Sequence, residues 1–215
     1  MIKNNFHFHI QKYKYIFWDF DGVIKESLDV KTNAFENLFK SYGPEIAERV
    51  RNHHLENIGI SRYKKIPLYL SWVNEPISNQ NIRTFCKNFS EIVVENVIKS
   101  PWVPGFLEFI NSTYGIKSNM LVTSTPQKEI DMILKKLDIQ IFFEKVFGAE
   151  TAKNKSIRIC IDRMKIDQCD CLMIGDTETD LKAAEENNIS FLLRKTHLNN
   201  KLQSNMTMNQ FSNYL

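Results

Sequence analysis

The sequence has no long apolar run, few cysteines and little excess of charge of either sign. No apolar stretch approaches the ~18 residues that a membrane-spanning helix needs, so we expect no membrane association. The formal net charge is only +3, which argues against nucleic acid as a partner. With 43% hydrophobic and 25% charged residues, the composition is that of an ordinary globular protein. The basic stretch 49–54 is expected on a solvated helix face.

The four cysteines do not form a metal-binding pattern. Cys169 and Cys171 are separated by a single residue, and no second pair at zinc spacing accompanies them. Residues 1–11 are polar and unlike the apolar segment of a secretory signal. Unpaired cysteines suit a reducing compartment, so the sequence favours a cytoplasmic protein.

Strand and helix patterns alternate in the second half of the chain, whereas residues 32–99 are almost entirely helical. Expected strands are 13–20, 118–122, 145–148, 171–175 and 190–194, and expected helices are 32–42, 45–56, 62–72 (interrupted by Pro67), 81–99, 106–114, 128–137, 155–164 and 179–188. This alternation predicts an α/β fold: a Rossmann-like parallel sheet with helices on both faces. The core is expected to comprise residues 1–24 and 101–215, with residues 25–100 as an α-helical insertion. The polar tail 196–215 could end in a docking helix or be loosely attached.

Two acids, Asp19 and Asp21, follow an apolar strand and precede Gly22. Residues two apart on a strand share one face, so both carboxylates can reach one site. Two such close acids resist ionising together unless a cation or hydrogen-bond donors compensate. Taken alone, the pattern fits equally a strand that runs into an Asp-Gly turn.

Polar residues also follow two other expected strands. Thr123 ends the strand 118–122, and Asp176 ends the strand 171–175, with Asp180 four residues later. Carboxylates gathered from separate strands suit Mg²⁺, which also binds phosphate oxygens. A lysine at the same edge would balance the charge. Helix phase favours Lys153 over Lys155 for this position.

These segments resemble the four motifs of the haloacid dehalogenase superfamily, in the subgroup that has a helical cap after the first strand. The motifs are Asp19-Phe-Asp-Gly-Val-Ile24, Leu121-Val-Thr-Ser-Thr-Pro126, Lys153 and Ile174-Gly-Asp-Thr-Glu-Thr-Asp180. The chain is similar to phosphoglycolate phosphatase and to beta-phosphoglucomutase-like proteins. The resemblance covers about residues 14–195 and implies that residues 25–100 are the cap.

The resemblance implies a role for each motif residue. Asp19 would be the nucleophile, forming an aspartyl-phosphate, and Asp21 the general acid and base. Thr123 and the backbone of Ser124 would hold phosphoryl oxygens, and Lys153 would offset their charge. The implied metal ligands are Asp19, Asp21 (through its main-chain carbonyl), Asp176 and Asp180, the last either through water or as an anchor for Lys153. Because dehalogenases need no acid at position 21, the resemblance favours phosphoryl transfer.

Further residues could contact the substrate, a small phosphorylated metabolite such as a sugar phosphate. The resemblance implies such contacts for Gly22 and for Arg62, in a cap loop 59–62 similar to a specificity loop; Arg62 could equally be a solvated arginine. Lys31 stands where relatives often have histidine, which weakens the case for a phosphomutase. Thr125 has an ordinary interpretation as part of a helix start before Pro126. The expected function is a Mg²⁺-dependent phosphatase; a phosphomutase and a catalytically idle binding module are the alternatives. The sequence leaves the oligomeric state open.

Overall fold

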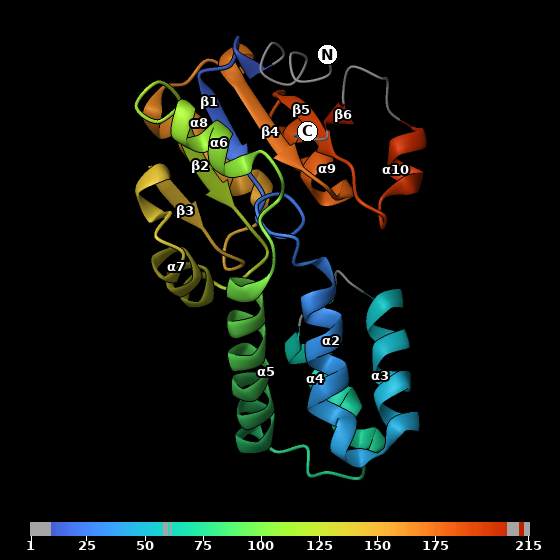
Figure 1. Ribbon diagram of the computed structural model, residues 1–215. Helices are drawn as coiled ribbons and strands as arrows, with labels where there is room; N and C mark the ends of the chain where they lie inside the picture. Colours follow the sequence, from blue (N-terminus) through green and yellow to red (C-terminus); the bar gives the residue numbers. More distant parts are fainter. Residues whose placement is uncertain (1–9, 58–59, 61, 206–210, 213–215) are drawn as a thin grey trace. The chain divides into compact units, whose positions relative to one another are not determined.

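The computed structural model describes residues 10–57, 60, 62–205 and 211–212, the last two by their backbone alone (Figure 1). The chain forms two compact units, one of residues 1–26 and 100–215 and the other of residues 27–99. Within the described part of the chain, no helix is both long and apolar enough to cross a membrane.

The first unit is built on a parallel sheet whose strand order is β3-β2-β1-β4-β5-β6. The strands are β1 (Tyr15–Trp18), β2 (Ser118–Val122), β3 (Lys145–Phe147), β4 (Cys171–Gly175), β5 (Ser190–Arg194) and β6 (Phe211–Ser212). Every neighbouring pair is parallel, which confirms the expected fold class. The two-residue strand β6 was not expected, because a polar tail carries no apolar pattern.

β1 lies at the point where the chain changes direction across the sheet (Figure 1). The strands β2 and β3 extend to one side of it, and β4 and β5 extend to the other. At such a switch point the connections that follow neighbouring strands leave toward opposite faces of the sheet. A crevice opens between them outside the carboxyl ends, and open α/β sheets bind ligands there. We therefore expect functional residues directly after β1, β2 and β4.

Helices cover both faces of this sheet. Phe17 packs with residues of α8 (Lys153–Met164) and α9 (Glu178–Glu186) in one buried cluster. The next residue, Trp18, contacts two phenylalanines of α6 (Phe106–Ser112), with ring centroids 5.4 Å and 5.7 Å away. Because consecutive strand residues point to opposite faces, α6 lies on the face opposite α8 and α9. Two further α-helices in the described part of this unit are α7 (Gln127–Lys136) and α10 (Asn200–Ser204).

The second unit contains α2 (Leu28–Phe39), α3 (Pro44–Glu56), α4 (Arg62–Trp72) and α5 (Asn79–Lys99). Its core is aromatic: the ring of Phe35 lies 4.1 Å from Phe89 and 5.5 Å from Tyr69 between centroids. Two expectations are wrong here. Pro67 does not interrupt α4, because burial of that helix's apolar face outweighs one missing hydrogen bond. His54 does not lie on the solvated face of α3, because its ring packs against Phe35 in the core.

Candidate active site

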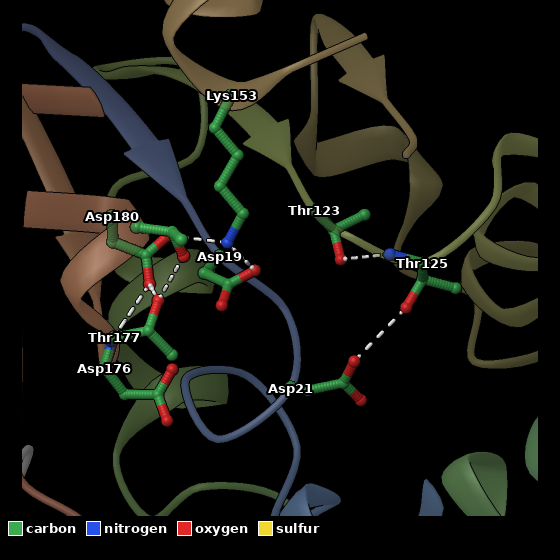
Figure 2. A network of polar contacts seen from close by, with 9 residues as sticks. Asp19, Asp21, Thr123, Thr125, Lys153, Asp176, Thr177 and Asp180 are labelled. Atoms are coloured by element: carbon green, nitrogen blue, oxygen red, sulfur yellow. Dashed lines mark hydrogen bonds and ion pairs between the residues drawn. The ribbon is translucent and has the colours of Figure 1, made fainter. Parts of the chain in front are cut away.

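Polar side chains follow three neighbouring strands at one edge of the sheet (Figure 2). Asp19 follows β1, Thr123 follows β2 and Asp176 follows β4, and all three are buried. The ladder continues into these residues: the Asp19 N–H donates to Ile174 O at 2.9 Å, and the Thr123 N–H donates to Phe147 O at 3.0 Å. The backbone of the sheet thus fixes where these side chains begin, which limits the freedom of the site.

Lys153 joins this group from the first turn of α8. Its Nζ lies 2.8 Å from Asp19 Oδ1 and 2.6 Å from Asp180 Oδ1, and its side chain is only 9% exposed. Lys155, two residues later, is exposed and is not part of the cluster. Of the two lysines considered from the sequence, Lys153 is therefore the one that contacts the acids.

Asp180 is held by several donors in addition to Lys153. Its Oδ2 accepts hydrogen bonds from the Thr177 N–H at 3.1 Å, the Thr177 hydroxyl at 2.6 Å and the Asp176 N–H at 3.3 Å. The bond from the Thr177 N–H is one half of a capping box at the start of α9, and the other half is the Asp180 N–H donating to the Thr177 side chain. A Cβ atom on Gly175 would lie 2.3 Å from Asp180 Cβ, so the close approach requires glycine there. Since both of its oxygens already accept hydrogen bonds, Asp180 has the geometry of an anchor for Lys153.

Asp176 differs from Asp180 in the hydrogen bonding of its carboxylate. Its Oδ1 is buried and has no hydrogen-bond partner within the part of the chain that the structure describes. Asp19, Asp176 and Asp180 each offer a carboxylate oxygen within 4.8 Å of the others. A buried acceptor without a donor is costly unless a cation meets it. The donor set, all carboxylate oxygen, therefore fits a hard divalent cation such as Mg²⁺. One contact was not expected: Asn199 donates to the Asp176 carbonyl at 2.8 Å, from a segment without a sequence signal.

The electrostatics of the cluster show an excess of negative charge. Burial raises the pKa of Asp19 to about 7, although Lys153 acts in the opposite direction. Burial raises the pKa of Asp176 well above its usual range, and the charges of Asp19 and Asp180 raise it further. For Lys153, burial lowers the pKa, but the two carboxylates outweigh burial and raise it overall. One ammonium group does not neutralise three buried carboxylates, and a divalent cation would relieve their repulsion.

Asp21 lies apart from the three clustered acids. It is half-buried, and its Oδ2 accepts a hydrogen bond from the Thr125 hydroxyl at 3.2 Å (Figure 2). The next residue, Gly22, has a φ of 75° and donates its N–H to Lys25 O at 2.8 Å. Thr125 is not the helix start expected from the sequence, since α7 begins at Gln127 after Pro126. Its contact with Asp21 has no signature in the sequence, because the two residues are 104 positions apart.

The remaining sequence-predicted residues lie in a turn of the α/β unit or in the helical unit. Ser124 is exposed in the turn after β2. Arg62 belongs to the helical unit, where its guanidinium lies 4.7 Å from the ring centroid of Phe89. Gly59 and Ser61 of the expected specificity loop lie outside the described residues. Lys31 is half-buried in α2 of the same unit.

Comparison with known proteins agrees with the fold and with the motifs of the site. Residues 16–193 match the haloacid dehalogenase-like hydrolase family. The chain belongs to this family, which confirms the resemblance drawn from its four motifs.

The individual relatives share low sequence identity with this chain. A phosphorylated carbohydrates phosphatase from Thermotoga maritima is 25% identical over 192 residues, which cover 85% of each chain. A candidate beta-phosphoglucomutase from Thermotoga maritima superimposes with a TM-score of 0.71 at 18% identity, over 94% of each chain. A predicted phosphoglycolate phosphatase from Haemophilus somnus 129pt superimposes with a TM-score of 0.68 at 16% identity, over 86% of each chain. At these identities the structural likeness shows the fold alone.

Proposed function

We propose that this chain is a Mg²⁺-dependent phosphatase that hydrolyses a small phosphorylated metabolite through an aspartyl-phosphate on Asp19. The observation that carries the proposal is the buried cluster in which Lys153 bridges Asp19 and Asp180 while Asp176 Oδ1 has no donor among the described residues. A carboxylate nucleophile, a buried ammonium and an unmatched acceptor together suit the transfer of a phosphoryl group, whose charge must be neutralised as it moves.

In the first step, a carboxylate oxygen of Asp19 forms a bond to phosphorus as the bond to the leaving oxygen breaks. Asp21 gives its proton to that oxygen, so that an alcohol rather than an alkoxide leaves. In the second step, Asp21 takes a proton from water as the water oxygen attacks phosphorus. Inorganic phosphate leaves and the Asp19 carboxylate is restored.

Lys153 and Thr123 hold and neutralise the phosphoryl group in this scheme. Lys153 stays charged because two carboxylates flank it. The Thr123 hydroxyl already accepts the Thr125 N–H at 3.1 Å, which directs its own hydrogen toward another acceptor, such as a phosphoryl oxygen.

The chemistry of the cluster supports one metal site. Asp19 and Asp176 would hold Mg²⁺ directly, together with the main-chain carbonyl of Asp21, and Asp180 would anchor Lys153. A bound Mg²⁺ would neutralise the phosphoryl oxygens and lower the repulsion between phosphate and carboxylates.

A sugar phosphate or a similar phosphoester is the proposed substrate class. The name of the Thermotoga maritima relative, a phosphorylated carbohydrates phosphatase, supports this choice. Residues 27–99 would serve as the cap that selects the substrate and excludes bulk water. No disulfide joins the four cysteines, all of which lie in the described part of the chain, and this supports the expected cytoplasmic location.

The test is phosphate release from a panel of phosphorylated sugars, nucleotides and small acids, with Mg²⁺ and with a chelator. We expect metal-dependent release from one class of ester. An isomeric ester in place of free phosphate would indicate a phosphomutase, and silence from the folded protein would indicate a binding module.

Asp19→Asn should remove turnover, by a factor on the order of 10⁴ or more, because an amide oxygen is a poor nucleophile. Circular dichroism should show an unchanged fold. Near-normal phosphate release by this variant would rule out the aspartyl-phosphate route.

A further inference from the structure

We propose that Thr125 is a positioning residue for the proton-transfer step, whose hydroxyl sets the orientation of the Asp21 carboxyl group. This inference rests on the proposed phosphatase function. The Thr125 Oγ1 lies 3.2 Å from Asp21 Oδ2, and Thr125 itself is 2% exposed. The hydroxyl is the donor and Asp21 Oδ2 the acceptor, so the other oxygen of Asp21 is the one that can carry the proton. Fixing one carboxylate oxygen sets the rotation of the whole group, and therefore the direction in which the other oxygen can exchange a proton.

The position of Thr125 is fixed from both sides of its peptide backbone. Its N–H donates to Thr123 Oγ1 at 3.1 Å, and its carbonyl accepts the Ala149 N–H at 2.9 Å. Its side chain is buried, so water does not compete freely for the hydroxyl. A donor whose backbone is held in this way gives a directed hydrogen bond without a further loss of conformational entropy during the reaction.

Two side-chain contacts tie the loop that carries Thr125 to the loop after β3. The Gly148 N–H donates to Gln127 Oε1 at 2.7 Å, and the Gln127 N–H donates to Glu150 Oε2 at 2.9 Å. A Cβ atom on Gly148 would lie 2.4 Å from Gln127 N and 2.9 Å from Thr125 O, so only glycine permits this approach. These contacts between the two loops hold Thr125 in its position beside Asp21.

The chemistry makes a specific demand on this contact. Proton donation by Asp21 matters most when the leaving group is an alkoxide, which is too basic to leave without a proton. An aryloxide such as p-nitrophenolate leaves readily without one. A residue that orients Asp21 should therefore matter more for an alkyl phosphate than for p-nitrophenyl phosphate. A residue that only stabilises the fold should affect both substrates equally.

The experiment compares kcat and KM of the wild type, Thr125→Val and Thr125→Ser on p-nitrophenyl phosphate and on the best alkyl phosphate of the panel. Valine keeps the branched shape of threonine and removes the hydroxyl, whereas serine keeps the hydroxyl. We expect Thr125→Val to lower kcat on the alkyl phosphate by about 10-fold and on p-nitrophenyl phosphate by less than about threefold. Thr125→Ser should recover most of the loss.

Two controls separate positioning from stability. Thr113→Val removes another buried hydroxyl of the same unit, one that donates to Phe109 O at 2.9 Å, and should leave both rates unchanged. In an Asp21→Asn background, Thr125→Val should cost little more, because the group that it orients no longer transfers a proton. If Thr125→Val does not fold, Thr125→Ala serves in the same comparison.

Equal losses on the two substrates, or a full additional loss in the Asp21→Asn background, would overturn the role of Thr125 while leaving the phosphatase function intact. A wild type that releases no phosphate from any ester with Mg²⁺ would overturn both proposals.

Discussion

Lys153 and Lys65, one largely buried lysine from each unit, have opposite surroundings. Lys153, in the α/β unit, lies between the carboxylates of Asp19 and Asp180. Lys65, in the helical unit, is 1% exposed and has no carboxylate partner among the described residues. Its Nζ lies 2.9 Å from His54 Nδ1 and 5.7 Å from the centroid of the Phe35 ring.

The same physical cause acts on both lysines, but only one of them has charges to oppose it. Burial lowers the pKa of Lys65 to about 8. Burial also acts on Lys153, but two carboxylates reverse the outcome and raise its pKa. The α/β unit thus keeps a permanent positive charge at the end of its strands, whereas the helical unit holds an amine that gives up its proton more easily. The first arrangement suits phosphoryl chemistry; the second costs stability near neutral pH.

Of the substitutions at the two lysines, Lys153→Met is expected to have the larger effect, since it keeps a similar volume and removes the charge. It leaves Asp19 and Asp180 without their shared cation, so we expect a loss of about 3–5 kcal/mol in the free energy of unfolding without metal. The value of kcat should fall by about 10²–10³. Urea unfolding and phosphate release measure the two losses. A fully active and stable variant would show that the contacts of Lys153 are incidental.

The next prediction concerns metal binding, which we expect in the α/β unit and not in the helical unit. We expect saturating Mg²⁺ to raise the melting temperature of the wild type by an amount on the order of 5 °C, because only the folded cluster binds it. Asp176→Asn should lose most of this shift, since the buried Oδ1 of Asp176 has no donor in the part of the chain that the structure describes. Lys65→Met, in the helical unit and without a carboxylate partner among the described residues, should retain the full shift. Equal shifts in all three proteins would place the metal elsewhere.

Lys65→Met is the matched substitution in the helical unit, and the opposite sign is expected. Removing a buried amine that has no carboxylate partner among the described residues should raise the free energy of unfolding at pH 7, by about 1–3 kcal/mol. Urea unfolding followed by circular dichroism gives this value directly. Destabilisation by several kcal/mol would mean that the Lys65–His54 hydrogen bond outweighs the burial of the charge.

A smaller effect concerns His54, whose pKa falls to about 3 through burial and the nearby charges of Lys65, Lys31 and His53. Because the usual histidine pKa is 6.5, the unfolded chain binds more protons between these two values. The contribution of neutral His54 to the free energy of unfolding is therefore fully present above pH 6.5 and declines as the pH falls below it.

His54→Asn keeps an acceptor for Lys65 but does not titrate. Between about pH 7 and pH 5.5, the wild type should lose about 1 kcal/mol more stability than this variant. Urea unfolding at several pH values measures the difference. Parallel curves for the two proteins would show that His54 titrates normally.

The sequence was sufficient for the fold and for most of the cluster. Apolar strands that end in Asp19, Thr123 and Asp176 implied a common edge, and helix phase separated Lys153 from Lys155. Contacts between distant segments left no such pattern. The pairing of Thr125 with Asp21 and the donation from Asn199 depend on loop conformations that periodicity does not describe.

Sequence patterns also fail to predict the buried polar contacts of the helical unit. Lys65 and His54 are polar residues on amphipathic helices. The sequence pattern therefore predicts that the stretch containing His54 is exposed to solvent. Their burial follows from packing against Phe35 and depends on how the helices meet, which local propensity does not determine. The fold class is therefore predictable from short-range patterns, whereas buried polar pairs require the three-dimensional structure.

The most direct test is whether Asp19 accepts a phosphoryl-like group in a metal-dependent way. Beryllium fluoride adds to a nucleophilic carboxylate as a mimic of the phosphoryl group, and fluorine NMR distinguishes its bound form from the free form. We expect a bound signal for the wild type with Mg²⁺, none with a chelator, and none for Asp19→Asn. A bound signal of equal strength in Asp19→Asn, or no signal from the folded wild type with Mg²⁺, would contradict the assignment of Asp19 as the nucleophile.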